Sequence, residues 1–301
     1  MAHRVVLIEN DAILKCKLDH LLAVIDNEEI WIPLSDISTI VVDNLKTTVT
    51  TRTLNAFSKE NICMVMCDEK HLPCGLFLSH NQHSRSAKII KYQLNFSDDL
   101  YSELWKKIIY AKIFNQIQVM ERLSHVDEVA KLYDYIENIQ PGDPSNREAH
   151  AAKVYFNTIM GTSHSRGNKD LLINSGLDYG YAIIRSYLAR LCCGHGLETA
   201  ISVHHCSEYN AFNLVDDLIE PMRPIVDYYA KEILDDDKIF GPSHRTNLVN
   251  ILNHKILFCN KEMYLSNALE KYVQSFVDVI KHGDLNKIQI PEFKNYIGIE
   301  Q

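Results

Sequence analysis

The fold is indicated first by residues 37–67, which read ISTIVVDNLKTTVTTRTLNAFSKENICMVMC. Its two ends, residues 37–42 and 62–67, are short apolar runs rich in β-branched residues, as buried strands are. Between them, residues 50–61 carry apolar side chains at helical spacing. The order of strand, helix and strand predicts a crossover helix that packs on a sheet.

Short apolar runs of the same kind flank this stretch on both sides, from residue 4 to about residue 78. Turn formers at residues 10–11 and 26–27 separate the runs, as they do in a compact sheet structure. We therefore predict a small β-rich N-terminal domain at residues 1–79.

The pattern changes after residue 80, where apolar residues recur at helical spacing over long segments. We predict helices at residues 84–94, 98–125, 127–138, 145–160, 174–193, 213–235, 243–258 and 266–281. The expected fold is thus α+β, with a larger all-α domain at residues 80–301 after the β-rich one.

Composition places the chain among globular proteins, since 46% of its 301 residues are hydrophobic. It has neither an apolar run long enough to cross a bilayer nor a secretory signal at its first residues, so we expect a cytoplasmic protein. Its 8 cysteines are scattered and suit reduced thiols better than a disulfide framework. Cys63, Cys67, His71 and Cys74 are an alternative zinc set, which the lack of a close Cys-x-x-Cys pair disfavours.

The formal net charge of -8 is an objection to DNA binding, because affinity for a duplex comes largely from Lys and Arg side chains at the phosphates. A local basic surface would answer the objection. Its candidates are Arg147, Lys153, Arg166, Lys169, Arg185, Arg190, Arg223 and Arg245. For each of these residues, an ordinary solvated charge remains the alternative.

Residues 145–156, which read SNREAHAAKVYF, place an acid on the side that a predicted helix should bury. Ser145 with Glu148 three residues later matches a capping box. Yet Glu148 also lines up with Ala152 and Tyr155 at the helical repeat, on the apolar face. A buried carboxylate needs a partner, and a cation is one. Capping and metal binding are both open for Glu148.

Residues 203–224, which read VHHCSEYNAFNLVDDLIEPMRP, gather further acids. Their apolar residues form one helical stripe, and Asp216, Asp217 and Glu220 project from roughly the opposite side. Asp216 and Glu220 are like charges four residues apart, which is unfavourable unless something positive lies beside them. Arg223 could serve on a solvated acidic face, and a divalent ion is the alternative.

Two prolines in this segment favour the metal alternative. Pro221 and Pro224 each lack a backbone N–H, so the helix should bend where its acids cluster. His204 and His205 lie just upstream. Carboxylate and imidazole ligands suit magnesium or manganese, whereas zinc would favour a set of thiolates.

Several other classes of site are missing from the sequence. It has no phosphate-binding loop, no glycine-rich dinucleotide motif after a strand, and no His-Glu-x-x-His motif. Residues 161–167 look like a nucleophile elbow, but the closing glycine is replaced by Ser165 and no strand precedes it. We interpret that segment as a polar loop.

The two acidic segments, with NSGLDYGYA at residues 174–182 between them, resemble motifs of the CRISPR-associated integrases that insert captured DNA as new spacers. The resemblance covers nearly the whole chain and is most similar to members from type II systems. It implies that Glu148, His205 and Glu220 are the catalytic and metal-binding residues, with Mg²⁺ or Mn²⁺ as cofactor. Asp217 matches a position that binds the metal or orients a ligand, and His204 is the neighbour that could be mistaken for His205.

The same resemblance implies the reaction and the partners. It predicts that 3'-hydroxyl ends of captured DNA are joined to the CRISPR repeat by transesterification. It also predicts a homodimer paired through the β domain, and two such dimers around a small dimeric CRISPR-associated partner. Two alternatives remain: a non-catalytic scaffold that binds DNA ends, and a helical metal phosphohydrolase that acts on nucleotides.

Overall fold

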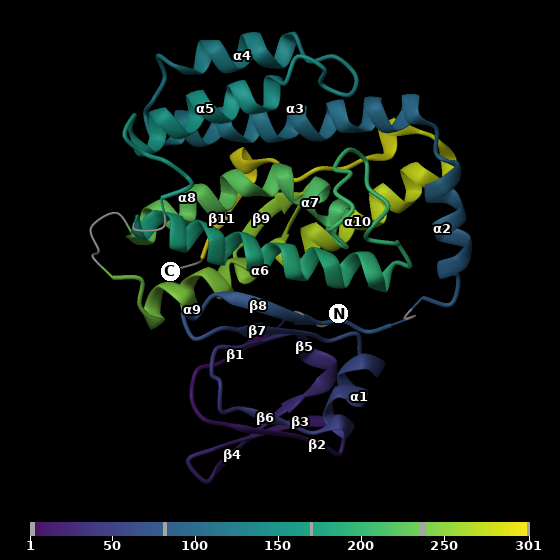
Figure 1. Ribbon diagram of the computed structural model, residues 1–301, viewed down its shortest axis with the longest axis vertical. Helices are drawn as coiled ribbons and strands as arrows, with labels where there is room; N and C mark the ends of the chain where they lie inside the picture. The colour runs from purple at the N-terminus through teal and green to yellow at the C-terminus, as the bar shows by residue number, and fades with distance from the viewer. Residues whose placement is uncertain (1–3, 81–82, 169–170, 235–238, 300–301) are drawn as a thin grey trace.

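The computed structural model describes residues 4–80, 83–168, 171–234 and 239–299. Figure 1 shows a β-rich part at one end of the long axis and a helical part at the other. Within the described ranges, no helix is long and apolar enough to span a membrane. The predicted α+β class is confirmed.

The β-rich part contains two four-stranded sheets. Its elements are β1 (Arg4–Ile8), β2 (Ile13–Lys17), β3 (His20–Ile25), β4 (Glu28–Pro33), β5 (Ile37–Val42), β6 (Thr48–Val49), α1 (Thr51–Lys59), β7 (Cys63–Cys67) and β8 (Pro73–Phe77). The sheet orders are β1-β5-β7-β8 and β4-β3-β2-β6. Because β5 and β7 pair in parallel and α1 connects them, the predicted crossover is confirmed.

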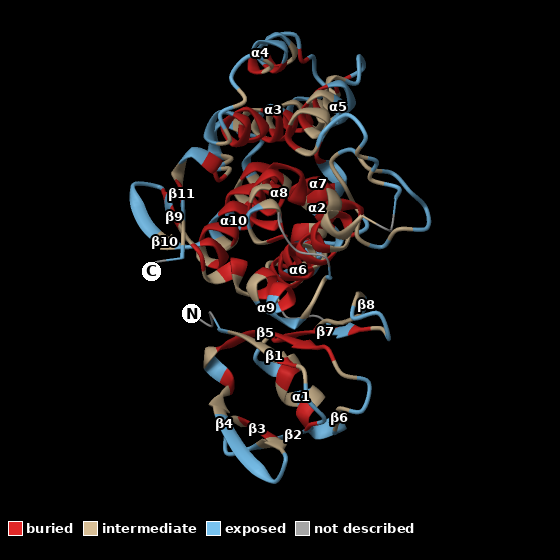
Figure 2. Ribbon diagram, turned by 90° about the vertical axis from the view of Figure 1, so that its left-hand side faces the viewer, coloured by how far each residue is buried: buried red, intermediate tan, exposed pale blue. Residues whose placement is uncertain are grey.

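One of these sheets is covered on both faces. Val42, Ile40 and Phe57 of the first sheet and α1 share a core with the second sheet. Val41, Cys63 and Val65 point the other way and belong to the core of the helical part. In Figure 2 the sheet accordingly lies between two buried layers, while the outer surface of β4 is exposed. Because successive side chains of a strand point to opposite faces, one face of this sheet packs in the β-rich core and the other in the helical core, and the two parts of the chain are thereby joined.

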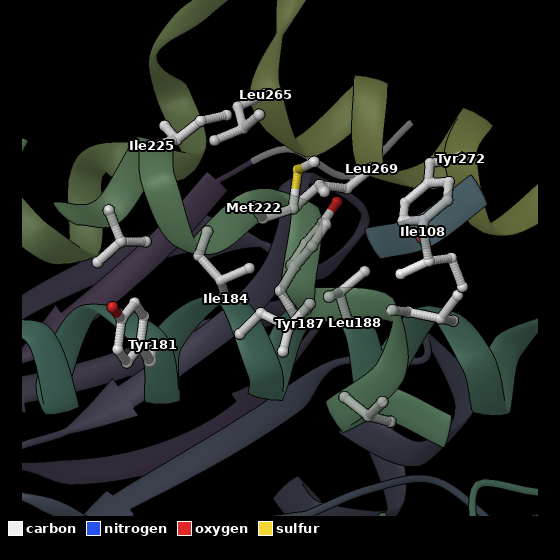
Figure 3. Close-up of a cluster of buried hydrophobic side chains, with 14 of the residues drawn as sticks. Ile108, Tyr181, Ile184, Tyr187, Leu188, Met222, Ile225, Leu265, Leu269 and Tyr272 are labelled. Carbon is white, nitrogen blue, oxygen red and sulfur yellow. The ribbon is translucent and has the colours of Figure 1, made fainter. Parts of the chain in front are cut away.

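The helical part is built around two long helices, α3 and α6. Its helices are α2 (Ser86–Asn95), α3 (Asp98–Arg122), α4 (Val129–Glu137), α5 (Arg147–Met160), α6 (Leu172–Gly194), α7 (Asn213–Ile219), α8 (Arg223–Leu234), α9 (Pro242–Asn250) and α10 (Leu265–His282). The side chains of Ile184, Tyr187 and Leu188 on α6 point toward Met222 and Leu269 (Figure 3). This core fixes the distance between α6 and the bent segment that carries the predicted acids.

Two glycines let α8 lie close to α6. A Cβ atom at Gly180 would lie 2.6 Å from Val226 Cγ1, and one at Gly176 would lie 2.3 Å from Leu234 Cδ1. Real Cβ atoms do not come that close, so a side chain at either position would force Val226 or the end of Leu234 to shift, and the β-branched Val226 has the less freedom to do so. The glycines of the NSGLDYGYA motif thus have a packing role.

The prediction of an all-α second part is wrong in one detail. A three-stranded antiparallel sheet, in the order β10-β9-β11, is formed by β9 (Lys255–Phe258), β10 (Lys261–Tyr264) and β11 (Tyr296–Gly298). The helix predicted at residues 243–258 ends at Asn250, and its last four residues are β9. Cys259 and Asn260 both have positive φ, 52° and 59°, and form the two-residue turn of the β9–β10 hairpin.

Candidate active site

The start of α5 presents Glu148 without using it as a cap. The N-cap is Asn146, whose side chain accepts a hydrogen bond from Ala149 N at 3.3 Å. The carboxylate of Asp143 accepts from Arg147 N at 2.8 Å and from Glu148 N at 2.9 Å. Of the two alternatives left open for Glu148, the capping box with Ser145 is therefore excluded, because Asn146 and Asp143 satisfy the helix start.

The acidic segment is interrupted at its first proline. A 3-10 helix, η2 (Glu220–Met222), separates α7 from α8 at Pro221. Asp217 is 0% exposed and Glu220 is 4% exposed. The alternative of a solvated acidic face is therefore wrong for these two residues.

One lysine joins the two predicted acids. The Lys112 ammonium on α3 donates to Glu148 Oε1 at 2.6 Å and also to Glu220 Oε2. Arg223 Nε donates to the other Glu220 oxygen at 2.8 Å. Two carboxylates and two cations thus form one chain of ion pairs that links α3, α5, η2 and α8.

Glu220 and Lys112 stabilise each other in their charged forms. Burial raises the pKa of Glu220, but the charges of Lys112 and Arg223 more than offset it and hold the value at about 2. Burial lowers the pKa of Lys112, and the charges of Glu220 and Glu148 outweigh that effect and raise it. Each charged group therefore depends on its partners.

Our sequence reasoning missed Lys112. The missed signal was a lysine one turn from Ile108 and Ile109 on the buried face of α3, where a charge needs a partner.

Asp217 organises the loop that carries the histidines. Its carboxylate accepts hydrogen bonds from the backbone N–H groups of Val203 at 2.6 Å, His204 at 2.9 Å and His205 at 3.1 Å. It also accepts from His205 Nδ1 at 2.5 Å. With four bonds to this carboxylate, the structure gives Asp217 an orienting position, and Nε2 is the His205 nitrogen left for a ligand.

The His205 side chain is half exposed, and its charge is linked to all three acids. The hydrogen bond to Asp217 raises the pKa of His205, burial opposes this, and the charges of Asp217, Glu220 and Glu148 raise it further. His205 is thus on the same side of the protein as the Lys112 network.

Trp105 supports both histidines from α3. Its ring stacks on His204, with centroids 4.4 Å apart and planes 4° apart. It meets the edge of His205 at 5.7 Å. Trp105 and Lys112 are two turns apart, so one face of α3 holds both the histidine loop and the acids.

The predicted basic residues divide into accessible and paired groups. Lys153 is exposed on α5. Arg147 lies over the Tyr135 ring at 5.6 Å. Arg166 pairs with Asp178 at 2.6 Å and is one-third exposed. These three stay candidates for DNA contacts, together with Arg223, which is already paired with Glu220. Lys169 lies outside the described residues.

Arg245 is not part of an exposed basic surface. It is 5% exposed, and its Nε donates to Asp43 at 2.6 Å across the boundary between the helical and β-rich parts. Arg190 is also buried and donates to the Asn61 carbonyl. Our prediction of Arg245 as a DNA contact is therefore replaced by a role in packing.

The donor set fits a hard divalent cation. Among the residues that the structure describes, no three His, Cys, Asp or Glu side chains already converge as a metal cage. However, the Lys112 ammonium shows that a single cation can contact Glu148 and Glu220 together. Two carboxylate oxygens and an imidazole nitrogen match the preference of Mg²⁺ or Mn²⁺.

The side chains of the alternative zinc set lie in an environment that does not favour zinc binding. Burial raises the pKa values of Cys63 and Cys67 to about 12, which disfavours the thiolates that zinc requires. His71 is bonded to Asp43 at 2.8 Å, and Cys74 is exposed. The four side chains are thus divided between the packed core, a hydrogen bond to the buried Asp43, and the surface.

Comparisons with known proteins identify the family of the chain. The family model described as CRISPR associated protein Cas1 matches residues 5–247. A CRISPR-associated endonuclease Cas1 of Neisseria meningitidis serogroup C (strain 8013) is 32% identical over 295 residues, which cover 97% of each chain.

Two solved structures share the fold at low identity. A casposase bound to integration product gives a TM-score of 0.78 at 17% identity, over 99% of this chain and 95% of that chain. A Cas6-RT-Cas1–Cas2 complex gives 0.77 at 17% identity, over 95% of this chain and 36% of that chain. The resemblance seen in the motifs is confirmed by the family model and the curated relative.

Proposed function

The chain belongs to the CRISPR-associated Cas1 family, and from this premise we propose that it is a divalent-metal-dependent DNA endonuclease and integrase of CRISPR adaptation. It joins 3'-hydroxyl ends of captured DNA to the CRISPR repeat by transesterification. The observation that carries the proposal is the convergence of Glu148 and Glu220 on one cation position beside His205. The names of the endonuclease relative and of the casposase neighbour support the reaction class.

The roles of the residues follow from their contacts. Glu148, Glu220 and Nε2 of His205 would hold Mg²⁺ or Mn²⁺, and Asp217 fixes His205 through Nδ1. When bound, the ion supplies Lewis-acid activation of the hydroxyl and of the attacked phosphate. Trp105 limits the movement of the His204–His205 loop. Arg223, held beside Glu220, adds positive charge near the phosphate.

The bond changes need no protein nucleophile. The 3'-oxygen of the captured end forms a bond to phosphorus in the repeat, and the bond to the repeat's own 3'-oxygen breaks. The proton of the attacking hydroxyl leaves to solvent, and the released 3'-oxygen takes one up. Water in place of the 3'-hydroxyl gives cleavage of DNA by the same chemistry.

The proposal includes DNA, a second copy of the chain and a small CRISPR-associated dimer as partners. The Cas1–Cas2 name of one structural neighbour supports the small partner. Lys153, Arg147 and Arg166 are the proposed local basic surface that offsets the net charge of -8. The exposed surface of β4 is available for pairing between copies.

The test is strand transfer of a short duplex with 3'-hydroxyl ends into a repeat-bearing plasmid, with the small partner present. Joining should require Mn²⁺ or Mg²⁺ and should be lost in Glu148→Ala and His205→Ala. Glu137→Ala, an exposed glutamate at the end of α4, is the matched control and should keep full activity. Strand transfer that survives in a Glu148→Ala/Glu220→Ala protein would exclude the assignment. Binding of DNA without joining under any metal would identify a scaffold instead.

A further inference from the structure

Lys112 occupies the position that a shared metal ion would need. Its side chain is 9% exposed and comes from α3, while the acids come from α5 and η2. Its ammonium contacts one oxygen of Glu148 and one of Glu220. The two acids are far apart in sequence, so this cation holds together carboxylates that would otherwise repel each other.

Two cations already contact the two acids. Glu148 and Glu220 are paired with Lys112 and Arg223. A divalent ion bound between the acids while Lys112 stayed in place would lie beside the ammonium, and like charges so close together repel each other. Both cations would also compete for the same carboxylate oxygens. The ammonium must therefore leave before a metal ion can bind both acids.

We propose that Lys112 is an internal counter-ion that competes directly with the divalent metal for Glu148 and Glu220. It keeps the two carboxylates together when no metal is present, and the metal binds by displacing its ammonium. This inference rests on the proposed function, because it takes Glu148 and Glu220 as metal ligands. The long, flexible lysine stem allows the ammonium to move by rotation of side-chain torsions alone.

The competition is tested by thermal unfolding of the whole protein during titration with MnCl₂. Lys112→Met removes the ammonium that pairs with Glu148 and Glu220. Without metal, its Tm should therefore be below that of the wild type. Mn²⁺ should then raise its Tm by more than it raises the wild-type Tm, and the apparent Kd for Mn²⁺ should fall at least tenfold. Lys107→Met removes the same charge from the same helix without touching the acids and should respond like the wild type.

A Mn²⁺ response of Lys112→Met that equals or falls below the wild-type response would overturn the proposal, since Lys112 would then assist metal binding. If Lys112→Met does not fold without metal, Mn²⁺ must restore its near-UV circular dichroism, and failure to do so also overturns it. The proposed function is tested separately. Loss of metal-dependent joining in wild-type protein would remove that function, whereas a weak Mn²⁺ response in Lys112→Met alone would leave it intact.

Discussion

Asp217 receives four hydrogen bonds on one carboxylate, three of them from consecutive backbone amides. A buried carboxylate with this many donors has its orientation fixed by the loop, and it fixes the loop in return. At the scale of single residues, the site therefore depends on a group that we propose not to touch the metal. Substitution of Asp217 therefore tests the positioning of a metal ligand separately from direct binding of the metal.

Asp217→Asn is expected to weaken Mn²⁺ binding about 10- to 100-fold, because the amide no longer orients His205 with a charge-assisted bond. Isothermal titration with MnCl₂ measures the effect. Asp216→Asn is the matched control, since the Asp216 carboxylate bonds to Arg185 and Asn210 rather than to His205. Equal losses of Mn²⁺ affinity in the two variants would show that removal of a negative charge, and not the orientation of His205, causes the effect.

Asp227 gives a pH dependence that differs from that of Glu220. Burial raises the pKa of Asp227 to about 6 from 3.8, although the Tyr181 hydroxyl and the Arg223 charge oppose this. The folded protein thus prefers the protonated acid, and stability is lost as pH rises from about 4 through 6, by on the order of 3 kcal/mol. For Glu220 the sign is opposite, and its stabilisation is lost only as pH falls from about 4.5 toward 2.

Urea unfolding between pH 4 and 7 distinguishes these contributions. Asp227→Asn should lack most of the decrease in unfolding free energy that the wild type shows between pH 4 and 6. An identical pH profile in the variant and the wild type would contradict a raised pKa at this position.

At the scale of elements, the separation of α6 and α8 is fixed by Gly176 and Gly180. Gly180→Ala should destabilise the protein by about 1–3 kcal/mol, because its Cβ would overlap Val226. In a protein that already carries Val226→Ala, Gly180→Ala should lower the unfolding free energy by much less, because the overlapping methyl group is gone. Chemical denaturation of the four proteins of this double-mutant cycle measures the coupling. If the effects of the two substitutions on the unfolding free energy were simply additive, α6 and α8 would have to move apart instead.

The elements were predictable to different degrees, for physical reasons. Long helices such as α3 and α10 were found within a few residues of their ends. The interruption of the helix at η2 followed from Pro221, which no helix interior accommodates well. By contrast, Lys255–Phe258 is a half-buried strand too short for periodicity to distinguish it from the end of a helix.

The site was only partly visible at the sequence level for a related reason. Spacing along a helix showed that Glu148 lies on a buried face, but it could not show what faces it from another helix. Lys112 and Trp105 are contributed by α3, which contains no motif of its own. Their roles arise from tertiary packing alone.

At the scale of the whole molecule, one buried ion pair joins the helical part to the β-rich part. Arg245 on α9 bonds to Asp43, which is 3% exposed, directly after β5. This contact explains why a basic residue that looked suited to DNA lies inside the protein. For DNA to bind, the net charge of -8 must then be offset locally by basic residues that remain at the surface.

Arg245→Met should therefore lower the unfolding free energy by roughly 3–5 kcal/mol, because it removes the guanidinium from the buried Asp43 and leaves the hydrogen bond from His71. Its DNA affinity, measured on the folded fraction, should be unchanged. Lys153→Met on exposed α5 should show the opposite pattern, with stability within about 0.5 kcal/mol of wild type and a salt dependence of DNA binding reduced by about one phosphate contact. If Arg245→Met instead weakened DNA binding with stability unchanged, the arginine would have to leave Asp43 for DNA. The two parts of the chain would then have to separate when DNA binds.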